Sequence, residues 1–209
     1  MRIQDLLSRK VVGVLGGAFD PVHDGHMDMA NHLVRANHVD EVWLMPSYSG
    51  KDFKSSAVDR YEMCRLAVTA NDDTRIKVCD FEIELMLESG TVGLMDALRT
   101  VYEHKFYFVI GTDQANNIHK WVNAAYLLSR NDFIVVRRPG LMSYPLPWRD
   151  WYRREDRHIY TQTRQISKIS STEIRRRLDD PVANREFLGM HMEDEVFDYI
   201  VRERLYGVH

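Results

Sequence analysis

Residue types suited to phosphate binding gather in one segment near the N-terminus, which reads Gly16-Gly17-Ala18-Phe19-Asp20-Pro21-Val22-His23-Asp24-Gly25-His26. A pair of glycines lets the backbone approach a phosphate closely. His23 and His26 lie near the start of a predicted helix, so both rings can point into one cleft. Each imidazole can donate a hydrogen bond to phosphate oxygens whose negative charge grows in a transition state. The segment therefore indicates phosphate chemistry.

The same segment also has a purely structural interpretation. A Gly-Gly turn after a strand is common, and one histidine at a helix start is more often a cap than a catalyst. A metal site on His23 and His26 is a further alternative, although the sequence positions no third ligand. Taken separately, these features favour the structural interpretation. Their joint occurrence at a strand-to-helix turn favours the functional one.

A second candidate anion site lies late in the chain, at Ile169-Ser170-Ser171-Thr172-Glu173-Ile174-Arg175. Ser170 and Glu173 have the spacing of a capping box, which predicts a helix start. The free N–H groups of the first turn, the hydroxyls of Ser171 and Thr172, and the Arg175 guanidinium would together attract an anion. The alternative is an ordinary capped helix with a basic outer face.

A third group comprises Gly111-Thr112-Asp113 and, further on, Trp121. A carboxylate at the end of a strand can bind a ribose or a base amino group, and an indole can stack on a flat ring. Alternatively, Asp113 only caps the next helix and Trp121 packs in the core.

The elements that would position these groups alternate along the chain. Short apolar runs predict strands at 11–15, 41–45, 76–78, 106–110 and 133–136, and helical spacing predicts helices at 27–34, 60–70, 92–101 and around Ile118, Val122 and Leu127. Alternating strands and helices imply parallel pairing, with both faces of the sheet covered. We therefore expect an α/β fold, a Rossmann-like parallel sheet with helices on both faces. A small helical C-terminal part would carry Val196, Tyr199 and Ile200 on a terminal helix, and residues 139–157 read as an irregular excursion.

Composition narrows the class of protein. The 209 residues suit a single domain, with a core over about 1–165 and a C-terminal part over about 166–209. A formal net charge of -3 gives no support to a nucleic-acid binder. No apolar stretch is long enough for a membrane span, and the N-terminus lacks the apolar run of a signal peptide. Cys64 and Cys79 form no CxxC pair, which argues against zinc and disulfides and suits a cytoplasmic location.

Together the three groups resemble the nicotinate/nicotinamide mononucleotide adenylyltransferases, a family of the nucleotidylyltransferase superfamily. The resemblance extends from Val11 to Leu178, and Arg137-Arg138-Pro139-Gly140 also matches in order and spacing. The His-x-Gly-His core alone also occurs in class I aminoacyl-tRNA synthetases, but the full motif is highly specific to this superfamily. A chain of 209 residues with no anticodon-binding portion is too short for a typical synthetase.

The resemblance implies an enzyme that transfers AMP from ATP to nicotinate or nicotinamide mononucleotide in NAD biosynthesis, forming the dinucleotide and pyrophosphate. Mg²⁺ would be bound with the ATP phosphates, with no metal site in the protein itself. The residues implied to be catalytic are His23, His26 and Arg175. Those implied to bind ATP are Gly16, Gly17, Ala18, Phe19, His23, His26, Asp113, Ser171, Thr172 and Arg175. Those implied to bind the mononucleotide are Lys54, Trp121 and Arg138.

Several positions depart from the family pattern. Ala18 stands where many members have a hydroxyl residue, and Ser49-Gly50-Lys51-Asp52-Phe53-Lys54 replaces the usual Pro-Pro-His-Lys, so either Lys51 or Lys54 takes the place of that lysine. The Ser-Tyr-Thr element near the pyridine site is replaced by Ser89-Gly90-Thr91-Val92-Gly93. We expect both mononucleotides to be accepted, with nicotinate mildly preferred because the remaining pattern looks bacterial.

Two other functions stay open at this point. One is an adenylyl- or cytidylyltransferase with another phosphate acceptor, such as phosphopantetheine, although that family usually has Thr or Ser where this chain has His23. The other is a catalytically silent nucleotide-binding protein, which would have no need for His23, His26, Ser171, Thr172 and Arg175 together. The expected partners are the two small substrates, with neither nucleic acid nor membrane, and a homo-oligomer is left open.

Overall fold

A single six-stranded sheet organises the molecule. The computed structural model describes residues 9–50, 52–137, 151–163 and 165–208. The sheet has the order β3-β2-β1-β4-β5-β6, and every neighbouring pair is parallel. Its strands are β1 (Val11–Gly17), β2 (Glu41–Pro46), β3 (Ile76–Val78), β4 (Lys105–Gly111), β5 (Asp132–Arg137) and β6 (Ile159–Gln162). This order is that of a Rossmann fold, as the sequence predicted.

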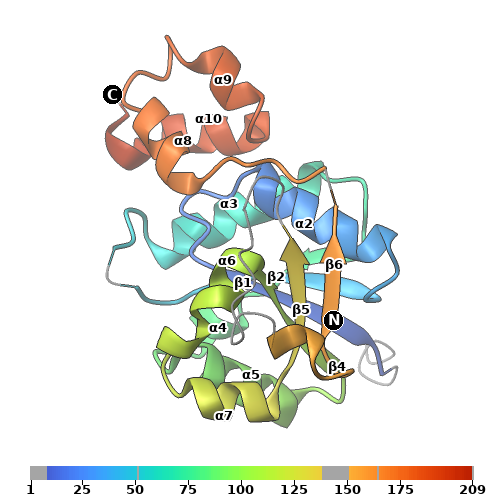
Figure 1. The fold of residues 1–209 in the computed structure, drawn as a ribbon. Helices are drawn as coiled ribbons and strands as arrows, with labels where there is room; N and C mark the ends of the chain where they lie inside the picture. The colour runs from blue at the N-terminus through green and yellow to red at the C-terminus, as the bar shows by residue number, and fades with distance from the viewer. Residues whose placement is uncertain (1–8, 51, 138–150, 164, 209) are drawn as a thin grey trace.

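Both faces of the sheet are buried, which explains why its strands read as continuous apolar runs. Alternate side chains of β2 enter two separate apolar clusters, with Val42 and Leu44 in one and Trp43 and Met45 in the other. On the first face lie α2 (Asp24–Arg35) and α3 (Ala57–Ala70), and on the second α5 (Gly90–Val101) and α7 (Ala124–Arg130) (Figure 1). The short helices α4 (Phe81–Glu84) and α6 (Thr112–Asn117) follow β3 and β4.

The C-terminal part is helical, as predicted, and it extends the first apolar cluster. It comprises α8 (Ser171–Arg177), α9 (Arg185–Gly189), α10 (Asp194–Arg202) and the short 3₁₀ segment η3 (Leu205–Gly207). Val196 and Ile200 of α10 are buried in the cluster that also holds α2 and α3 residues. The Tyr199 hydroxyl donates to Oδ1 of Asp59 on α3 at 2.9 Å. Figure 1 shows this helical part above α2 and α3.

The structure corrects two predictions about elements and adds one strand. The helix predicted around Ile118, Val122 and Leu127 is interrupted: α6 leads into the 3₁₀ segment η1 (Ile118–Lys120), and α7 begins only after Asn123, which has a positive φ of 53°. Val122 is 78% exposed, so its helical spacing from Ile118 did not indicate a buried helix face. The segment predicted to be irregular contains the 3₁₀ segment η2 (Trp151–Arg153). It is followed by the sixth strand, β6, which the sequence analysis did not predict.

Residues 138–150, including Arg138, lie outside the described part of the chain. Within the described part, no helix combines the length and the apolar character that a membrane crossing requires.

Candidate active site

The glycine-rich turn sits where the strand order of the sheet reverses. β1 pairs with β2 on one side and β4 on the other, and ligands of such sheets bind beyond the carboxyl ends of the strands at this point. A Cβ on Gly16 would lie 3.0 Å from the ring of Phe108, so a larger residue there would have to displace that ring. After Gly17 the chain turns through buried Phe19, whose φ is 49°, and enters α2.

His23 and His26 meet at the start of α2. His23 is the N-cap residue of α2 and is only 4% exposed. The His23 N–H donates to Nδ1 of His26 at 3.3 Å, and the two rings stack with centroids 3.8 Å apart. The Phe19 ring packs edge-to-face against the His26 ring, with centroids 4.8 Å apart, and this contact further restricts His26. The structure therefore brings both predicted histidines together as one rigid pair, and the cap and the candidate catalyst are the same residue.

Gly25 lets α2 carry this pair. A Cβ at this position would lie 3.0 Å from the backbone oxygen of Ser167 and 3.1 Å from the His23 ring. Contacts this short would force the helix away from the C-terminal part or displace the His23 ring. The glycine between the histidines thus has a packing reason of its own.

The start of α8 lies against the glycine-rich turn, although the two are far apart in sequence. Ser170 caps α8 by accepting from the Glu173 N–H at 3.2 Å. Ser171 Oγ donates to the Pro21 carbonyl at 2.9 Å, and Arg175 donates to the Asp20 carbonyl. Thr172 Oγ1 accepts from Arg175 Nη2 at 3.2 Å. The structure thus places the late hydroxyl and arginine residues beside the turn that carries the histidines.

A buried cluster behind the turn escaped the sequence analysis. Asp20 is 2% exposed, and its carboxylate accepts hydrogen bonds from the Lys54 N–H at 2.7 Å, from Ser55 Oγ at 2.5 Å and from the Tyr206 hydroxyl at 2.8 Å. These bonds tie the turn to the loop before α3 and to the C-terminal end of the chain. Lys54, a predicted substrate-binding residue, is therefore anchored to the turn through its backbone, while the residue itself is exposed.

Arg60 supports the turn from α3. It is fully buried, and it donates from Nη1 to the Ala18 carbonyl at 3.0 Å and from Nη2 to the Tyr48 carbonyl at 3.3 Å. Its guanidinium lies 4.2 Å from the centre of the Phe53 ring. Burial lowers the pKa of Arg60, whereas the nearby Asp20 carboxylate raises it. A signal did exist, because Arg60 shares the apolar helix face of Met63 and Ala67, where a lone arginine is unexpected.

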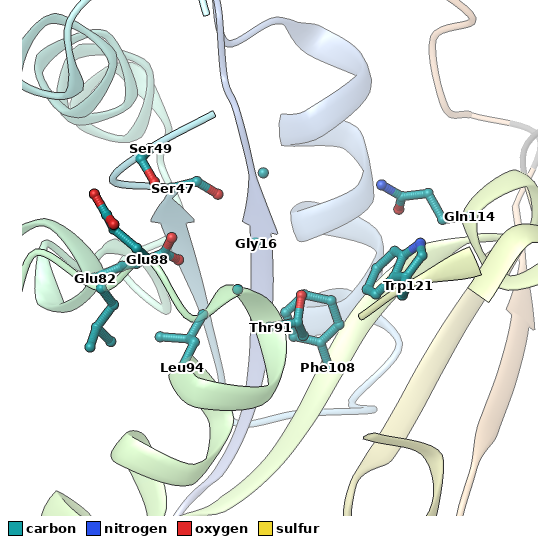
Figure 2. Close-up of a pocket in the computed structure, with 13 residues that line it drawn as sticks. Gly16, Ser47, Ser49, Glu82, Glu88, Thr91, Leu94, Phe108, Gln114 and Trp121 are labelled. Carbon is teal, nitrogen blue, oxygen red and sulfur yellow. The ribbon is translucent and has the colours of Figure 1, made fainter. Parts of the chain in front are cut away.

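A cavity of about 230 Å³ opens beside the glycine-rich turn. Figure 2 shows Trp121 and Gln114 on one flank, Glu82 and Glu88 on the other, and Thr91, Leu94 and Phe108 between them. Ser47, Ser49, Gly16, Gly17, Leu87 and Gly90 complete the lining. Trp121 is half-buried and packs edge-to-face on Phe108 with centroids 6.1 Å apart. Trp121 therefore packs on the core, as the structural alternative predicted, and it also lines the cavity, where stacking on a flat ring stays a prediction.

Asp113 does not line this cavity. It is exposed on the first turn of α6, and the neighbouring Gln114 contributes to the lining instead. Asp113 is also not the helix cap, because Gly111 holds that position and its N–H donates to Gln114 Oε1 at 3.3 Å.

Glu82 is the buried ionisable group of the cavity. It is 6% exposed, and its Oε1 accepts from the Tyr48 N–H at 3.1 Å. Burial raises the pKa of Glu82 to about 7, opposed by the Tyr48 hydrogen bond and by the charge of Arg60. Among the described residues, no group of three or more His, Cys, Asp or Glu side chains could hold a metal ion.

The sequence is similar to known proteins over most of its length. Residues 14–177 match the model of the cytidylyltransferase-like family. A probable nicotinate-nucleotide adenylyltransferase of Bacillus licheniformis is 32% identical over 203 residues, which cover 93% of this chain and 97% of that protein. One from Oceanobacillus iheyensis is 34% identical over 203 residues, covering 94% and 96%.

A similar fold occurs in a solved structure at lower identity. The nicotinic acid mononucleotide adenylyltransferase of Plasmodium falciparum, in complex with NaAD, superposes with a TM-score of 0.81 at 20% identity. The superposition covers 96% of this chain and 99% of that one. At this identity the likeness concerns the fold.

Proposed function

The chain belongs to the nicotinate-nucleotide adenylyltransferase family, and from this premise we propose that it transfers the AMP group of ATP to nicotinate or nicotinamide mononucleotide. The products are the dinucleotide and pyrophosphate, a step of NAD biosynthesis. The observation that carries the proposal is the convergence of His23, His26, Ser171 and Arg175 on one turn, next to a cavity with an indole wall.

The chemistry needs alignment rather than a protein nucleophile. A phosphate oxygen of the mononucleotide attacks the α-phosphorus of ATP, and the bond from that phosphorus to the β-phosphate oxygen breaks as pyrophosphate leaves. Two mutually repelling polyanions must be held in line, and charge must be stabilised on the leaving group. Imidazole, hydroxyl and guanidinium donors at one turn meet both needs.

The roles follow from these positions. His23 and His26 would donate to the ATP phosphates, and Gly16, Gly17, Ala18 and Phe19 would supply the backbone that lies along them. Ser171, Thr172 and Arg175 would hold the β- and γ-phosphates, because the start of α8 lies against the same turn. Trp121 would stack on the pyridine ring, with Lys54 near the phosphate between the two substrates.

The residues present fit a Mg²⁺ ion that is bound through ATP rather than by the protein. Mg²⁺ prefers oxygen ligands and usually reaches a protein through substrate phosphates. The donors at the turn are imidazole, hydroxyl and guanidinium groups, and the Asp20 carboxylate already accepts three hydrogen bonds. When bound, the ion would neutralise charge on the phosphate oxygens.

Trp121 also favours a pyridine acceptor over phosphopantetheine, since an indole wall suits a flat ring. The test is pyrophosphate release from ATP with each acceptor in turn. The proposal predicts turnover with a pyridine mononucleotide and none with phosphopantetheine. Pyrophosphate release with phosphopantetheine alone would overturn it. The expectations of a cytoplasmic location and of no nucleic-acid partner stay predictions.

A further inference from the structure

Arg60 joins the two loops that border the candidate active site. One loop is the glycine-rich turn after β1, and the other is the segment after β2 that contains Tyr48. Nη1 of Arg60 donates to the Ala18 carbonyl at 3.0 Å, and Nη2 donates to the Tyr48 carbonyl at 3.3 Å. One side chain of α3 therefore holds a backbone group of each loop.

Each of these loops serves a different part of the site. Ala18 belongs to the turn that is proposed to lie along the ATP phosphates. Tyr48 stands between Ser47 and Ser49, which both line the cavity. Figure 2 shows these two serines on the same flank of the cavity as Glu82. The two carbonyl groups thus belong to the ATP side and to the cavity side of the site.

The guanidinium that joins the loops is itself held in place. Arg60 is fully buried, and its guanidinium carbon lies 4.2 Å from the centre of the Phe53 ring. The Tyr48 N–H donates to Oε1 of Glu82 at 3.1 Å, so both backbone groups of Tyr48 are bound by side chains. A guanidinium presents its N–H groups in a rigid planar fork, and bonds from a charged donor are the stronger ones. The fork therefore sets the spacing between the Ala18 and Tyr48 carbonyls.

We propose that Arg60 is a positioning residue, which holds the glycine-rich turn and the cavity wall at the spacing that in-line transfer requires. The inference rests on the proposed function and adds to it the residue that aligns its two substrates. A misplacement of about 1 Å between reacting groups can lower a rate roughly a hundredfold. A substrate that orders one loop also orders the other through Arg60, so each substrate should strengthen binding of its partner.

The alternative role for Arg60 is charge alone. Burial lowers the pKa of Arg60, and the nearby Asp20 and Glu82 carboxylates oppose this shift. A cation there would stabilise both carboxylates without aligning anything. Arg60→Lys separates the two roles, because lysine keeps the charge but lacks the rigid fork that reaches both carbonyls.

The experiment compares the full wild-type chain with Arg60→Lys, Phe53→Leu and Arg65→Lys. Pyrophosphate release gives kcat, and calorimetric titration gives Kd for ATP and for nicotinate mononucleotide separately. Arg60→Lys should lower kcat by about tenfold or more, because alignment is lost, and leave each separate Kd nearly unchanged. Phe53→Leu keeps Arg60 but removes the ring beside the guanidinium, so kcat should fall less. Arg65 is exposed on the same helix and pairs with Glu62 at 2.6 Å, so Arg65→Lys should behave like the wild type.

A second titration measures the coupling between the two substrates. In the wild type, a non-hydrolysable ATP analogue should lower Kd for nicotinate mononucleotide by about fivefold or more, and in Arg60→Lys this effect should disappear. A merely structural role would lower the melting temperature and leave the coupling unchanged. Thermal unfolding is therefore measured for each variant, and if Arg60→Lys does not fold, Phe53→Leu carries the same comparison.

Wild-type kcat in folded Arg60→Lys would show that charge suffices and would overturn the inference. So would a coupling that is absent from the wild type or is unchanged in the variants. A wild type that releases no pyrophosphate with either pyridine mononucleotide would refute the proposed function itself. Release that Arg60→Lys leaves unchanged would refute the positioning role alone.

Discussion

At the scale of single residues, the two motif histidines hold each other in position. The His23 N–H bond to His26 Nδ1 and the stacked rings fix both imidazoles before any ligand arrives. A donor that is already in place contributes most where charge develops in a transition state, because no reorganisation is needed at that moment. The His-x-Gly-His spacing could be found in the sequence, but the stacking of the two rings could not.

His26→Ala should lower kcat by roughly a hundredfold or more, as expected for the loss of one preorganised donor, while the fold stays intact. Steady-state turnover together with thermal unfolding checks this. His104→Ala, at the opposite end of the sheet before β4, is the control and should keep near-normal turnover. Wild-type turnover in folded His26→Ala would remove His26 from the catalytic set.

Arg175→Ala should weaken ATP binding by about 1.5–3 kcal/mol, the value of a charge-assisted hydrogen bond, and affect the mononucleotide much less. The reason is its position on α8, against the Asp20 carbonyl. Arg176→Ala is a matched control, because Arg176 is exposed and pairs with Glu173 at 2.7 Å instead. Separate titrations with ATP and with the mononucleotide measure both effects. Equal weakening of the two would place Arg175 elsewhere.

The raised pKa of Glu82, about 7, makes binding in the cavity depend on pH. Burial raises this pKa, and the Tyr48 N–H and the charge of Arg60 oppose the shift. Below about 7 Glu82 is largely neutral, and above it the charged form repels a carboxylate in the cavity. KM for the mononucleotide with a carboxylate should therefore rise as pH increases through about 7. Glu82→Gln should remove this part of the profile and leave only the titration of the substrate phosphate. Equal pH profiles of KM in the wild type and in Glu82→Gln would contradict the expectation.

At the scale of elements, the sequence predicted the strands that run through two apolar clusters and missed the edge strand β6. β2 and β4 are buried on both faces, so their composition alone identifies them. Among the described strands β6 pairs with β5 alone, and of its four residues only Thr161 is buried, so its composition leaves little pattern. Val122 lies at helical spacing from Ile118 but is exposed, and the chain leaves the helical conformation at Asn123, which has a positive φ and precedes α7.

Gly25→Ala tests whether α2 needs its close approach to the C-terminal part. The new Cβ would meet the Ser167 oxygen and the His23 ring, so we expect a loss of about 1–3 kcal/mol in the free energy of unfolding and reduced turnover. Gly189→Ala at the end of α9 is the control, since its nearest neighbours are at 3.4 and 4.0 Å. It should be neutral or stabilising by about 0.4–1 kcal/mol. Denaturant titration compares the two, and equal stabilities would show that α2 is free to shift.

At the scale of the whole molecule, the site depends on contacts between distant parts of the chain. Ser171 reaches Pro21 across 150 positions, and Tyr206 reaches Asp20 across 186. Such pairings leave no local signal, which explains why the sequence predicted an anion site at Ser171 and Arg175 but not its contact with the glycine-rich turn. For the same reason it gave no role to Asp20 or Tyr206. The cavity likewise forms only in the folded chain, between Glu82, which follows β3, and Trp121, which follows β4.

Tyr206→Phe tests this long-range closure. The Tyr206 hydroxyl donates to Asp20 Oδ1 at 2.8 Å and lies 3.1 Å from Ser55 Oγ. Burial and the nearby Asp20 carboxylate both raise the pKa of Tyr206, so its hydroxyl keeps its proton. Removing one hydrogen bond to a charged group should cost about 1.5–3 kcal/mol of unfolding free energy. The melting temperature should fall by several degrees, and KM for ATP should rise because Asp20 shapes the turn. Tyr126→Phe removes an exposed hydroxyl bond to Asp96 at 3.2 Å and should change neither. If Tyr206→Phe melts like the wild type with an unchanged KM, the C-terminal end does not support the site.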